Sequence, residues 1–321
     1  MRNRAGDLLA WSCLAAGVLG LLMRYVLKDR VAVLAVVFYG LPPLVAAVLF
    51  AVSLALGVRR PRKRWKISLP GVLMLVALGA WLQSDFVWAG SRPRSDDSLR
   101  VVLWNLSRPS ATETSFVPVL QETEAQIILL VESGGDTVAR QHFWDSHFGD
   151  YHVSLLPGEM TLLSRFPIRS TRSTTVDGVT TVVECDLVLP GGMLSVVGVD
   201  VASAHCSRSR YSFERINAIV RSKHDPVLVL GDFNTPHTSI LFNDLRRSFR
   251  HAFEASGRGF VTTWPSLLPV LAIDHIWLSE GLVPVRTVLR RTLHSDHALV
   301  IADIAVESTV APPELMSSVE R

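Results

Sequence analysis

Residues 227–239 read VLVLGDFNTPHTS. The apolar run predicts a short buried strand, which ends at Gly231 and is followed at once by Asp232, an aromatic residue and Asn234. Side chains two positions apart lie on the same side of an extended chain, so Asp232 and Asn234 leave the strand together. An Asp or Asn at one strand end most often caps a turn. This stretch therefore indicates a functional site only if other strands end in the same way.

Polar residues also stand where five other apolar runs begin or end, namely Asn105 after VVLW, Glu132 after IILLV, Asp200 after VVGV, Asp274 with His275 after VLAI, and Asp296 with His297 before ALVIADI. If these strand ends meet at one edge of the sheets, they form a pocket of oxygen donors with one or two imidazoles. Oxygen donors suit a hard divalent cation such as Mg²⁺ or Mn²⁺. A zinc site needs more His or Cys at short spacing, and the chain has no HExxH or CxxC motif.

Such a pocket supports hydrolysis of a phosphodiester or a phosphomonoester. The substrate is an anion and gains charge as water attacks, so a cation that neutralises this charge lowers the barrier. A carboxylate is needed to orient or deprotonate the attacking water. In this interpretation Asp232 acts on the water, and Asn234 holds an oxygen of the phosphate or of the water.

From residue 99 onward the chain consists of short apolar or alternating runs, which predict strands. Three segments between these runs, residues 115–124, 210–222 and 239–249, are predicted to be helices. Runs that are apolar throughout suit strands covered on both faces. The pattern predicts an α/β sandwich over residues 99–307, with sheets packed on each other and helices outside, followed by a loose tail over residues 308–321.

The first 90 residues have a different character. Residues 8–27, 31–58 and 67–87 are three apolar stretches, each long enough to cross a bilayer as a helix. A cleaved signal peptide explains only the first stretch, and a buried pair of soluble helices does not explain three in succession. The short loop 59–66, RRPRKRWK, is dense in basic residues and is expected to stay in the cytoplasm. The chain is thus predicted to be a multi-pass protein of the cell membrane, with residues 91–98 as a linker and the C-terminal domain on the non-cytoplasmic side.

Charge is divided between these two parts. Residues 1–95 hold 13 Lys and Arg against 3 Asp and Glu, and residues 96–321 hold 19 against 26, a net charge of −7. An acidic domain argues against tight, sequence-independent DNA binding, which requires a basic surface. The cysteines, Cys13, Cys185 and Cys206, are too few for a disulfide framework, although one Cys185–Cys206 bridge is conceivable outside the cytoplasm.

Six motifs occur in a fixed order between residues 99 and 306: WNL, LLVES, LLSRFPI, GDFNTP, IDHIWLS and HSDHALV. Together they resemble the endonuclease/exonuclease/phosphatase superfamily, and GRGFVTTWP ahead of IDHIWLS is similar to its membrane-anchored bacterial branch. The resemblance implies a four-layer α/β sandwich, with two central mixed sheets flanked by helices and preceded here by three transmembrane helices. It also implies a metal-dependent hydrolase that acts on phosphoric ester bonds.

Carried over residue by residue, the resemblance suggests roles for the strand-end side chains. Asn105 and Glu132 resemble the metal-binding pair of the family, and Asp296 resembles an acid at or beside the metal. His297 is similar to the imidazole that contacts the phosphate. Asp274 is similar to the carboxylate that holds this histidine.

The GDFN turn matches the family, but one neighbouring position does not. Asp232 resembles the residue that activates the water, and Asn234 its neighbour that orients the phosphate. Where the family carries a His or a Tyr after the strand LSVVGV, this chain has Asp200, an acid that repels an anionic substrate unless it is protonated or metal-bound. Asp200 could add a metal ligand, or His205 could take over from a loop. The alternative is a catalytically weakened domain that binds a ligand or a partner.

Two further residues are candidates for contact with the substrate. His237 follows the GDFN turn closely in sequence, and Arg208 stands where a helix begins. Trp264 is expected to serve packing rather than base stacking, and His275 is expected to be structural. The expected partners are the lipid bilayer and a phosphate-ester substrate, which could be a nucleic acid, a phospholipid head group or another phosphodiester. No obligate protein partner is implied.

Overall fold

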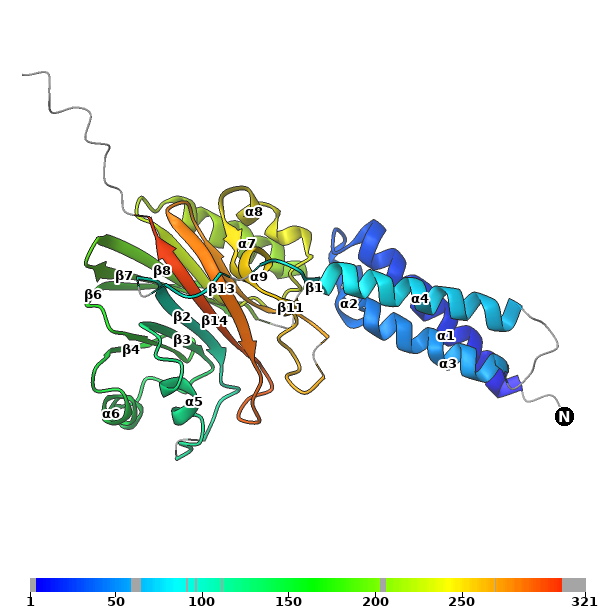
Figure 1. Cartoon of the computed structure of the whole chain (residues 1–321), viewed down its shortest axis with the longest axis horizontal. Coiled ribbons are helices and arrows are strands. Elements are labelled where there is room, and N and C mark those ends of the chain that lie inside the picture. Colours follow the sequence, from blue (N-terminus) through cyan, green and yellow to red (C-terminus); the bar gives the residue numbers. More distant parts are fainter. Residues whose placement is uncertain are drawn as a thin grey trace, which may run out of the picture.

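The computed structural model describes residues 4–58, 65–90, 92–95, 97–110, 112–202, 206–268 and 270–307. Figure 1 shows a rod of helices built from the N-terminal residues and a layered α/β domain built from the rest. The predicted tail, residues 308–321, lies outside the described residues.

The described residues of the rod form α1 (Arg4–Leu22), the π-helical turn η1 (Met23–Leu27), α2 (Ala32–Gly40), α3 (Pro43–Val58) and α4 (Trp65–Asp85). Two helices, Arg4–Leu27 and Ile67–Asp85, are long and apolar enough to cross a membrane. The bent pair Val33–Gly40 and Pro43–Val58 makes a third if the pair is one span. The stretch 31–58, predicted as a single kinked span, is therefore two helices.

The break between these two helices lies at Leu41 and Pro42, and the helices are bent by 70°. A proline lacks the N–H that continues a helix and restricts the residue before it, so Pro42 and Pro43 end α2 and start α3. On the N-terminal side of this bend, α2 packs against helix α7 (Cys206–Arg221) of the domain.

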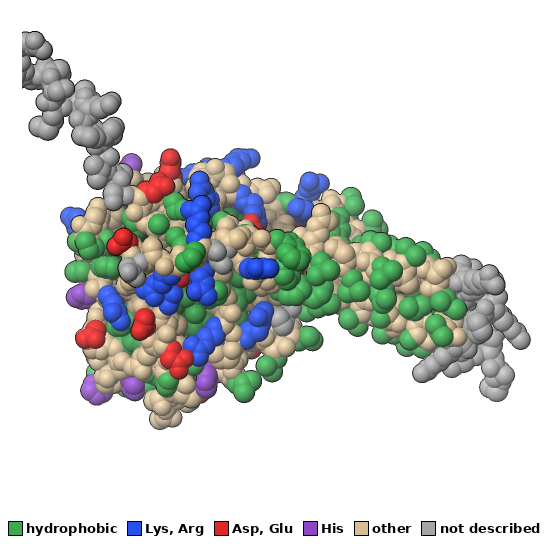
Figure 2. All heavy atoms as spheres, in the orientation of Figure 1, with side chains coloured by type: hydrophobic (Ala, Val, Ile, Leu, Met, Phe, Trp, Pro, Cys, Tyr) green, Lys and Arg blue, Asp and Glu red, His purple; other side chains and the backbone are tan. Residues whose placement is uncertain are grey.

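Small residues let the helices of the rod approach one another closely. A Cβ on Gly17 of α1 would lie 2.6 Å from the ring of Phe50 on α3. Leu14, Ala46 and Ala77 pack around this contact. The outer surface of the rod is rich in apolar side chains (Figure 2). Close packing of small residues is how helices are held together in lipid. Together with the apolar outer surface, this packing suits a bilayer.

Two six-stranded mixed sheets form the centre of the domain. The first has the order β13 (Leu282–Arg290), β14 (Leu299–Val306), β2 (Leu99–Asn105), β3 (Ile127–Val131), β5 (Met160–Ser164) and β4 (His152–Leu156). The second has the order β10 (Arg250–His251), β12 (Asp274–Leu278), β9 (Val227–Asp232), β8 (Gly192–Asp200), β7 (Thr180–Leu189) and β6 (Ile168–Val176). The pairs β2–β3 and β8–β9 are parallel, and the other pairs are antiparallel.

The sheets pack face to face, and helices cover their outer faces. Leu129 of the first sheet and Leu230 of the second belong to the core between the sheets. The outer helices are α5 (Val117–Gln121) and α6 (Val138–His147) on the first sheet, and α7, η2 (Ile240–Asn243) and α8 (Leu245–Ser248) on the second. The short helix α9 (Ala252–Ser256) instead packs against β13 and β12. The four-layer α/β sandwich is confirmed. The segment 239–249, predicted as one helix, is a 3₁₀ turn and a short α-helix.

The rod joins the domain through a small sheet. β1 (Phe86–Val87) directly follows α4 and pairs with β11 (Gly259–Phe260). Val261 N donates to Asp85 O at 2.9 Å, and Trp81 of α4 stacks on Phe260 with ring centroids 4.3 Å apart. The end of α4 is therefore in direct contact with the domain.

Candidate active site

The ends of β8, β9 and β12 bring three carboxylates together. In the register of the second sheet, Asp232 lies opposite Asp200 on one side and opposite Asp274 on the other. Asp232 and Asp274 are buried. Burial, and then the charge of Asp274, raises the pKa of Asp232 well above its usual value. Such a row of acids is costly unless it binds a proton or a cation.

Asn105 joins the two sheets at this edge. It ends β2, is buried, and donates from Nδ2 to Asp232 Oδ2 at 3.0 Å. The parallel strands β2 and β3 end together, with Asn105 opposite Val131, so Glu132 follows at the same edge. The structure thus brings residues from both sheets to the end of β9, as the strand-end pattern predicts.

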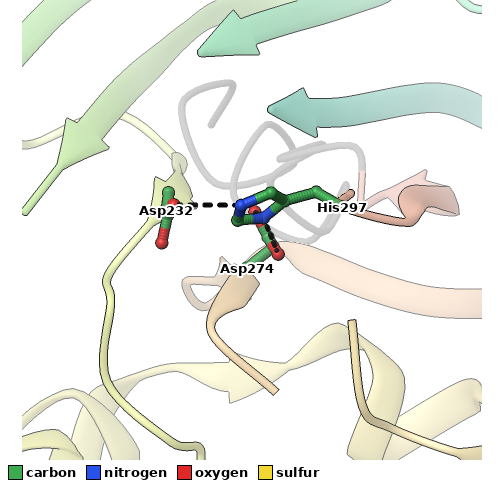
Figure 3. A group of neighbouring side chains, drawn as sticks. All are labelled: Asp232, Asp274 and His297. Carbon is green, nitrogen blue, oxygen red and sulfur yellow. Dashed lines mark hydrogen bonds and ion pairs between the residues drawn. The ribbon is translucent and has the colours of Figure 1, made fainter. Parts of the chain in front are cut away.

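His297 lies between two of the carboxylates (Figure 3). Its Nδ1 donates to Asp274 Oδ2 at 2.9 Å, and its Nε2 lies 4.0 Å from Asp232 Oδ2. Burial opposes protonation of the ring, but Asp274 outweighs it, and the pKa of His297 rises to about 9. At neutral pH the ring is therefore a cation that can donate from Nε2 to an anion.

In GDFN the chain leaves β9 and bends, and Gly231 near the end of the strand has to be glycine. Gly231 has φ 156°, and a Cβ there would lie 1.8 Å from Val199 O. Asn234 follows in the left-handed region with φ 45°, and its N–H donates to Asp232 Oδ1 at 2.8 Å. Its side-chain Nδ2 donates to Val201 O at 2.7 Å. The amide is thus fixed by the backbone, and its Oδ1 is the atom left to receive a hydrogen bond from a ligand.

Asp200 lies within electrostatic reach of the same acids. Burial and the charge of Glu132 raise the pKa of Asp200 to about 6, although Arg108 opposes the rise. Asp200 therefore belongs to the acidic cluster. It is mostly protonated only below about pH 6, and protonation there reduces its repulsion of an anion.

Two residues of this edge were not predicted from the sequence. Arg108 forms ion pairs with Glu132, Nη1 to Oε2 at 3.0 Å, and with Glu159, Nε to Oε2 at 2.7 Å. Arg108 stands three residues after Asn105, which is the only signal for it in the sequence. Glu159 comes from the turn between β4 and β5, and no motif marks it.

Asp296 is held beside His297 by two donors. Ser107 Oγ donates to Asp296 Oδ1, and Trp264 Nε1 donates to Oδ2 at 2.9 Å. Burial raises the pKa of Asp296, but these hydrogen bonds outweigh it and lower the pKa below its usual value. Trp264, expected to serve packing, thus also contacts the site.

The candidates for substrate contact lie elsewhere or outside the described residues. His237 is buried, and its Nε2 hydrogen-bonds to Ser84 O at 3.1 Å at the end of the rod, so the structure does not bring it to the carboxylates. His205 lies outside the described residues, as does the side chain of Arg208. Cys185 is a free, buried thiol in the core between the sheets, which excludes the Cys185–Cys206 bridge.

The donors at this edge fit a hard divalent cation. Asp232, Asp274 and His297 each place one donor atom within 4.8 Å of the others, a spacing that could hold a metal ion. His297 Nδ1 already pairs with Asp274, so the ligand atoms left over at the edge are mainly carboxylate and amide oxygens. Oxygen donors of this kind bind Mg²⁺ or Mn²⁺.

Comparison with known proteins agrees with this fold. The family model described as the endonuclease/exonuclease/phosphatase family matches residues 102–297. None of the curated protein sequences compared with the chain matches it. An endonuclease/exonuclease/phosphatase from Bacteroides vulgatus has a TM-score of 0.55 at 14% identity, over 65% of this chain and 99% of that one. D. rerio TDP2, complexed with single strand DNA product, has a TM-score of 0.52 at 12% identity, over 65% of this chain and 99% of that one.

At these identities the solved structures show a shared fold and nothing finer. The family match carries more weight, because it runs from within β2 to His297 and so contains the residues that build the cluster of acids. The chain belongs to the endonuclease/exonuclease/phosphatase family.

Proposed function

We propose that the protein is a membrane-anchored, divalent-metal-dependent phosphoesterase that hydrolyses a phosphodiester or a phosphomonoester. The observation that carries this proposal is the convergence of Asn105, Asp232 and the Asp274–His297 pair at one edge of the family's sandwich. The family consists of enzymes of this general kind, and the acids at the edge provide the donors and the base that such hydrolysis needs.

Asn105 and Glu132 are the residues we assign to the cation, with Asp200 as a further oxygen donor. When bound, the cation neutralises charge that develops on the phosphate and its leaving oxygen. The ion pair between Arg108 and Glu132 is compatible with this assignment, because Arg108 is an exposed side chain that can turn away from Glu132.

Asp232 is the base in this proposal. Its raised pKa suits a carboxylate that takes a proton from water near neutral pH. The water oxygen attacks phosphorus, the P–O bond to the leaving group breaks, and the leaving oxygen takes up a proton. A diester and one water thus give a phosphate monoester and an alcohol. His297 donates from Nε2 to a phosphate oxygen, and Asp274 keeps the ring charged and oriented.

The arrangement of the rod supports an external domain. Helices α1 and α4 begin, and α3 ends, at the end of the rod far from the domain (Figure 1). In the sequence the basic stretch 59–66 follows Val58, the last residue of α3, and short basic loops stay in the cytoplasm. We therefore propose a multi-pass membrane protein with the catalytic domain on the non-cytoplasmic side. A C-terminal reporter that is active only outside the cytoplasm tests this, and a cytoplasmic signal would contradict it.

A second candidate is a ligand- or partner-binding domain with weakened catalysis. The observation that favours it is Asp200, which stands where the family carries His or Tyr. An acid close to the phosphate costs binding energy whenever it is ionised.

One assay separates the two candidates. The full-length protein in detergent is incubated with bis(p-nitrophenyl) phosphate and Mg²⁺ or Mn²⁺, and then with EDTA. The enzyme is expected to turn over only with metal, and Asp232→Asn and His297→Ala are each expected to lower kcat by about 10²-fold or more. His142→Ala, on the exposed side of α6, is the matched control. Absence of metal-dependent turnover in a folded wild-type protein would contradict the enzyme and favour the binding domain.

A further inference from the structure

Three leucines stand out on the surface of the domain. Leu267 and Leu268, in the loop between β11 and β12, are 80% and 69% exposed, and Leu293, in the loop between β13 and β14, is 85% exposed. Two adjacent, nearly bare leucines at a loop tip expose apolar surface to water with no gain in packing. We name the loop segments 264–268 and 291–296 the leucine rim.

The leucine rim borders the candidate active site. Trp264 Nε1 donates to Asp296 Oδ2 at 2.9 Å, and Ser266 N donates to Asp296 O at 2.6 Å. Asp296 directly precedes His297 in the chain. The loop that carries the two leucines therefore begins with two hydrogen bonds to the residue next to the catalytic imidazole.

The segment 264–268 of the leucine rim also lies on the side of the domain that the rod joins. The loop follows β11, which pairs with β1, and Val261 N donates to Asp85 O at the end of α4. Figure 1 shows the loop after β11 reaching toward the level at which the rod begins. Trp88 is 73% exposed just after β1. Tryptophan at this level is typical of the boundary between lipid and water.

We propose that the leucine rim inserts into the bilayer that holds the rod, and that the substrate is a phosphate ester of a lipid in that bilayer. This inference rests on the proposed function for its chemistry. Trp88 and the segment 264–268 both follow strands of the small sheet that joins the rod to the domain, so the bilayer around the rod is the occupant we assign to this segment. If these leucines are inserted, the head group of a neighbouring lipid can reach His297 while its acyl chains remain in the membrane.

A nucleic acid fits an active site bordered by the leucine rim less well. The leucines present no cation and no hydrogen-bond donor to a polyanion, and residues 96–321 carry a net charge of −7. Bilayer insertion, in contrast, gains from every apolar group that leaves water. The same two leucines thus disfavour one class of substrate and favour the other.

The double substitution Leu267→Ser with Leu268→Ser tests the proposal in the full-length protein. Hydrolysis of phosphatidylcholine, phosphatidylethanolamine and phosphatidylglycerol is followed by mass spectrometry in reconstituted vesicles, and hydrolysis of bis(p-nitrophenyl) phosphate is followed in parallel. We expect lipid turnover to fall by at least about tenfold and turnover of the soluble diester to stay unchanged. Val138→Ser, which alters an 88% exposed apolar residue on α6, is the matched control and leaves both rates unchanged.

Insertion is measured independently of activity. Tryptophan fluorescence of Leu268→Trp in nanodiscs with brominated lipids is expected to be quenched more than that of Val138→Trp. Equal quenching overturns the proposal even if the protein is an active phosphoesterase. Wild-type turnover of the soluble diester or of single-stranded DNA without turnover of any of the three lipids also overturns it, as does loss of self-association in the double variant without change in lipid turnover. Absence of all turnover contradicts the proposed function instead, and the quenching result then still decides whether the rim inserts.

Discussion

At the scale of single residues, the contact between Asp274 and His297 is the part of the site that chemistry depends on most. Asp274→Asn keeps the shape of the side chain but removes the charge that raises the pKa of His297. We expect kcat for a phosphodiester to fall by about 10²–10⁴-fold, with KM little changed, because the lost charge acts through His297 and not on the substrate. Steady-state kinetics of the full-length protein with Mg²⁺ measures both constants.

The matched control is Asp145→Asn on α6. Its exposed carboxylate accepts a hydrogen bond from Gln141 Nε2 on the same helix. This variant should have wild-type constants. An Asp274→Asn variant with wild-type kcat would show that the pair has no part in turnover.

Two buried histidines support the backbone next to the site. Glu254 N donates to His251 Nδ1 at 3.2 Å, so His251 donates from Nε2 to His275 Nδ1 at 3.0 Å. His275 then donates from Nε2 to Thr235 O at 2.9 Å. Thr235 follows the GDFN turn directly. The chain of donors is complete only while both rings are neutral.

This neutrality predicts a loss of stability in acid. Burial lowers the pKa of His251 to about 4 and that of His275 well below its usual value. Unfolded histidines titrate near pH 6.5, so below that pH the unfolded chain binds more protons than the folded chain. The free energy of unfolding should be independent of these groups above pH 6.5 and should fall between pH 6.5 and 4, by roughly 3 kcal/mol for one ring. Thermal unfolding in detergent at a series of pH values measures this.

His251→Gln should make the pH dependence shallower, because one of the two rings is gone. His142→Gln, which changes an exposed histidine of α6, should leave the pH dependence as it is. A wild-type protein whose unfolding temperature is the same at pH 7 and pH 4.5 would contradict the account of the buried rings.

At the scale of elements, strands follow from the sequence more faithfully than helices do. β3 and β9 are buried along their whole length, and their unbroken apolar runs identify them without any tertiary information. The helix predicted over residues 239–249 divides into η2 and α8, and the span over residues 31–58 divides at Pro42. Pro42 and Pro43 mark the second break in the sequence, but no proline or glycine marks the first. The 70° bend between α2 and α3 cannot be read from the local pattern.

The junction of rod and domain contains a buried ion pair that couples two elements. Arg24 of η1 and Asp85 of α4 lie 2.8 Å apart, with side chains 4% and 2% exposed. Arg24→Met leaves Asp85 buried without its partner, and we expect a loss of about 3–5 kcal/mol in the free energy of unfolding. Thermal or denaturant unfolding of the full chain in detergent measures the loss.

The double variant Arg24→Met with Asp85→Leu serves as the control for this pair. It removes both charges, so it should recover most of the loss caused by Arg24→Met alone. A double variant no more stable than the single one would mean that the pair itself is not what stabilises the junction.

At the scale of the whole molecule, the strand-end pattern predicts the acids of the site because the topology brings those ends to one edge. Arg108 and Glu159 could not be predicted in this way. They come from turns, and their approach depends on how two distant segments fold over the edge. His237 is close to GDFN in sequence, but its side chain hydrogen-bonds to Ser84 O at the end of the rod and not to a residue of the site. Contacts between the rod and the domain join residues far apart in the sequence, so they cannot be predicted from a local sequence pattern.

The most direct test of the central claim is to locate the cation. Crystals of the full-length protein, or a cryo-electron microscopy grid, are prepared with Mn²⁺ and inorganic phosphate. We expect Mn²⁺ to be bound by oxygens of Asn105 and Glu132, with phosphate within hydrogen-bond distance of His297 Nε2. Mn²⁺ found only at the protein surface, or phosphate bound away from His297, would contradict it.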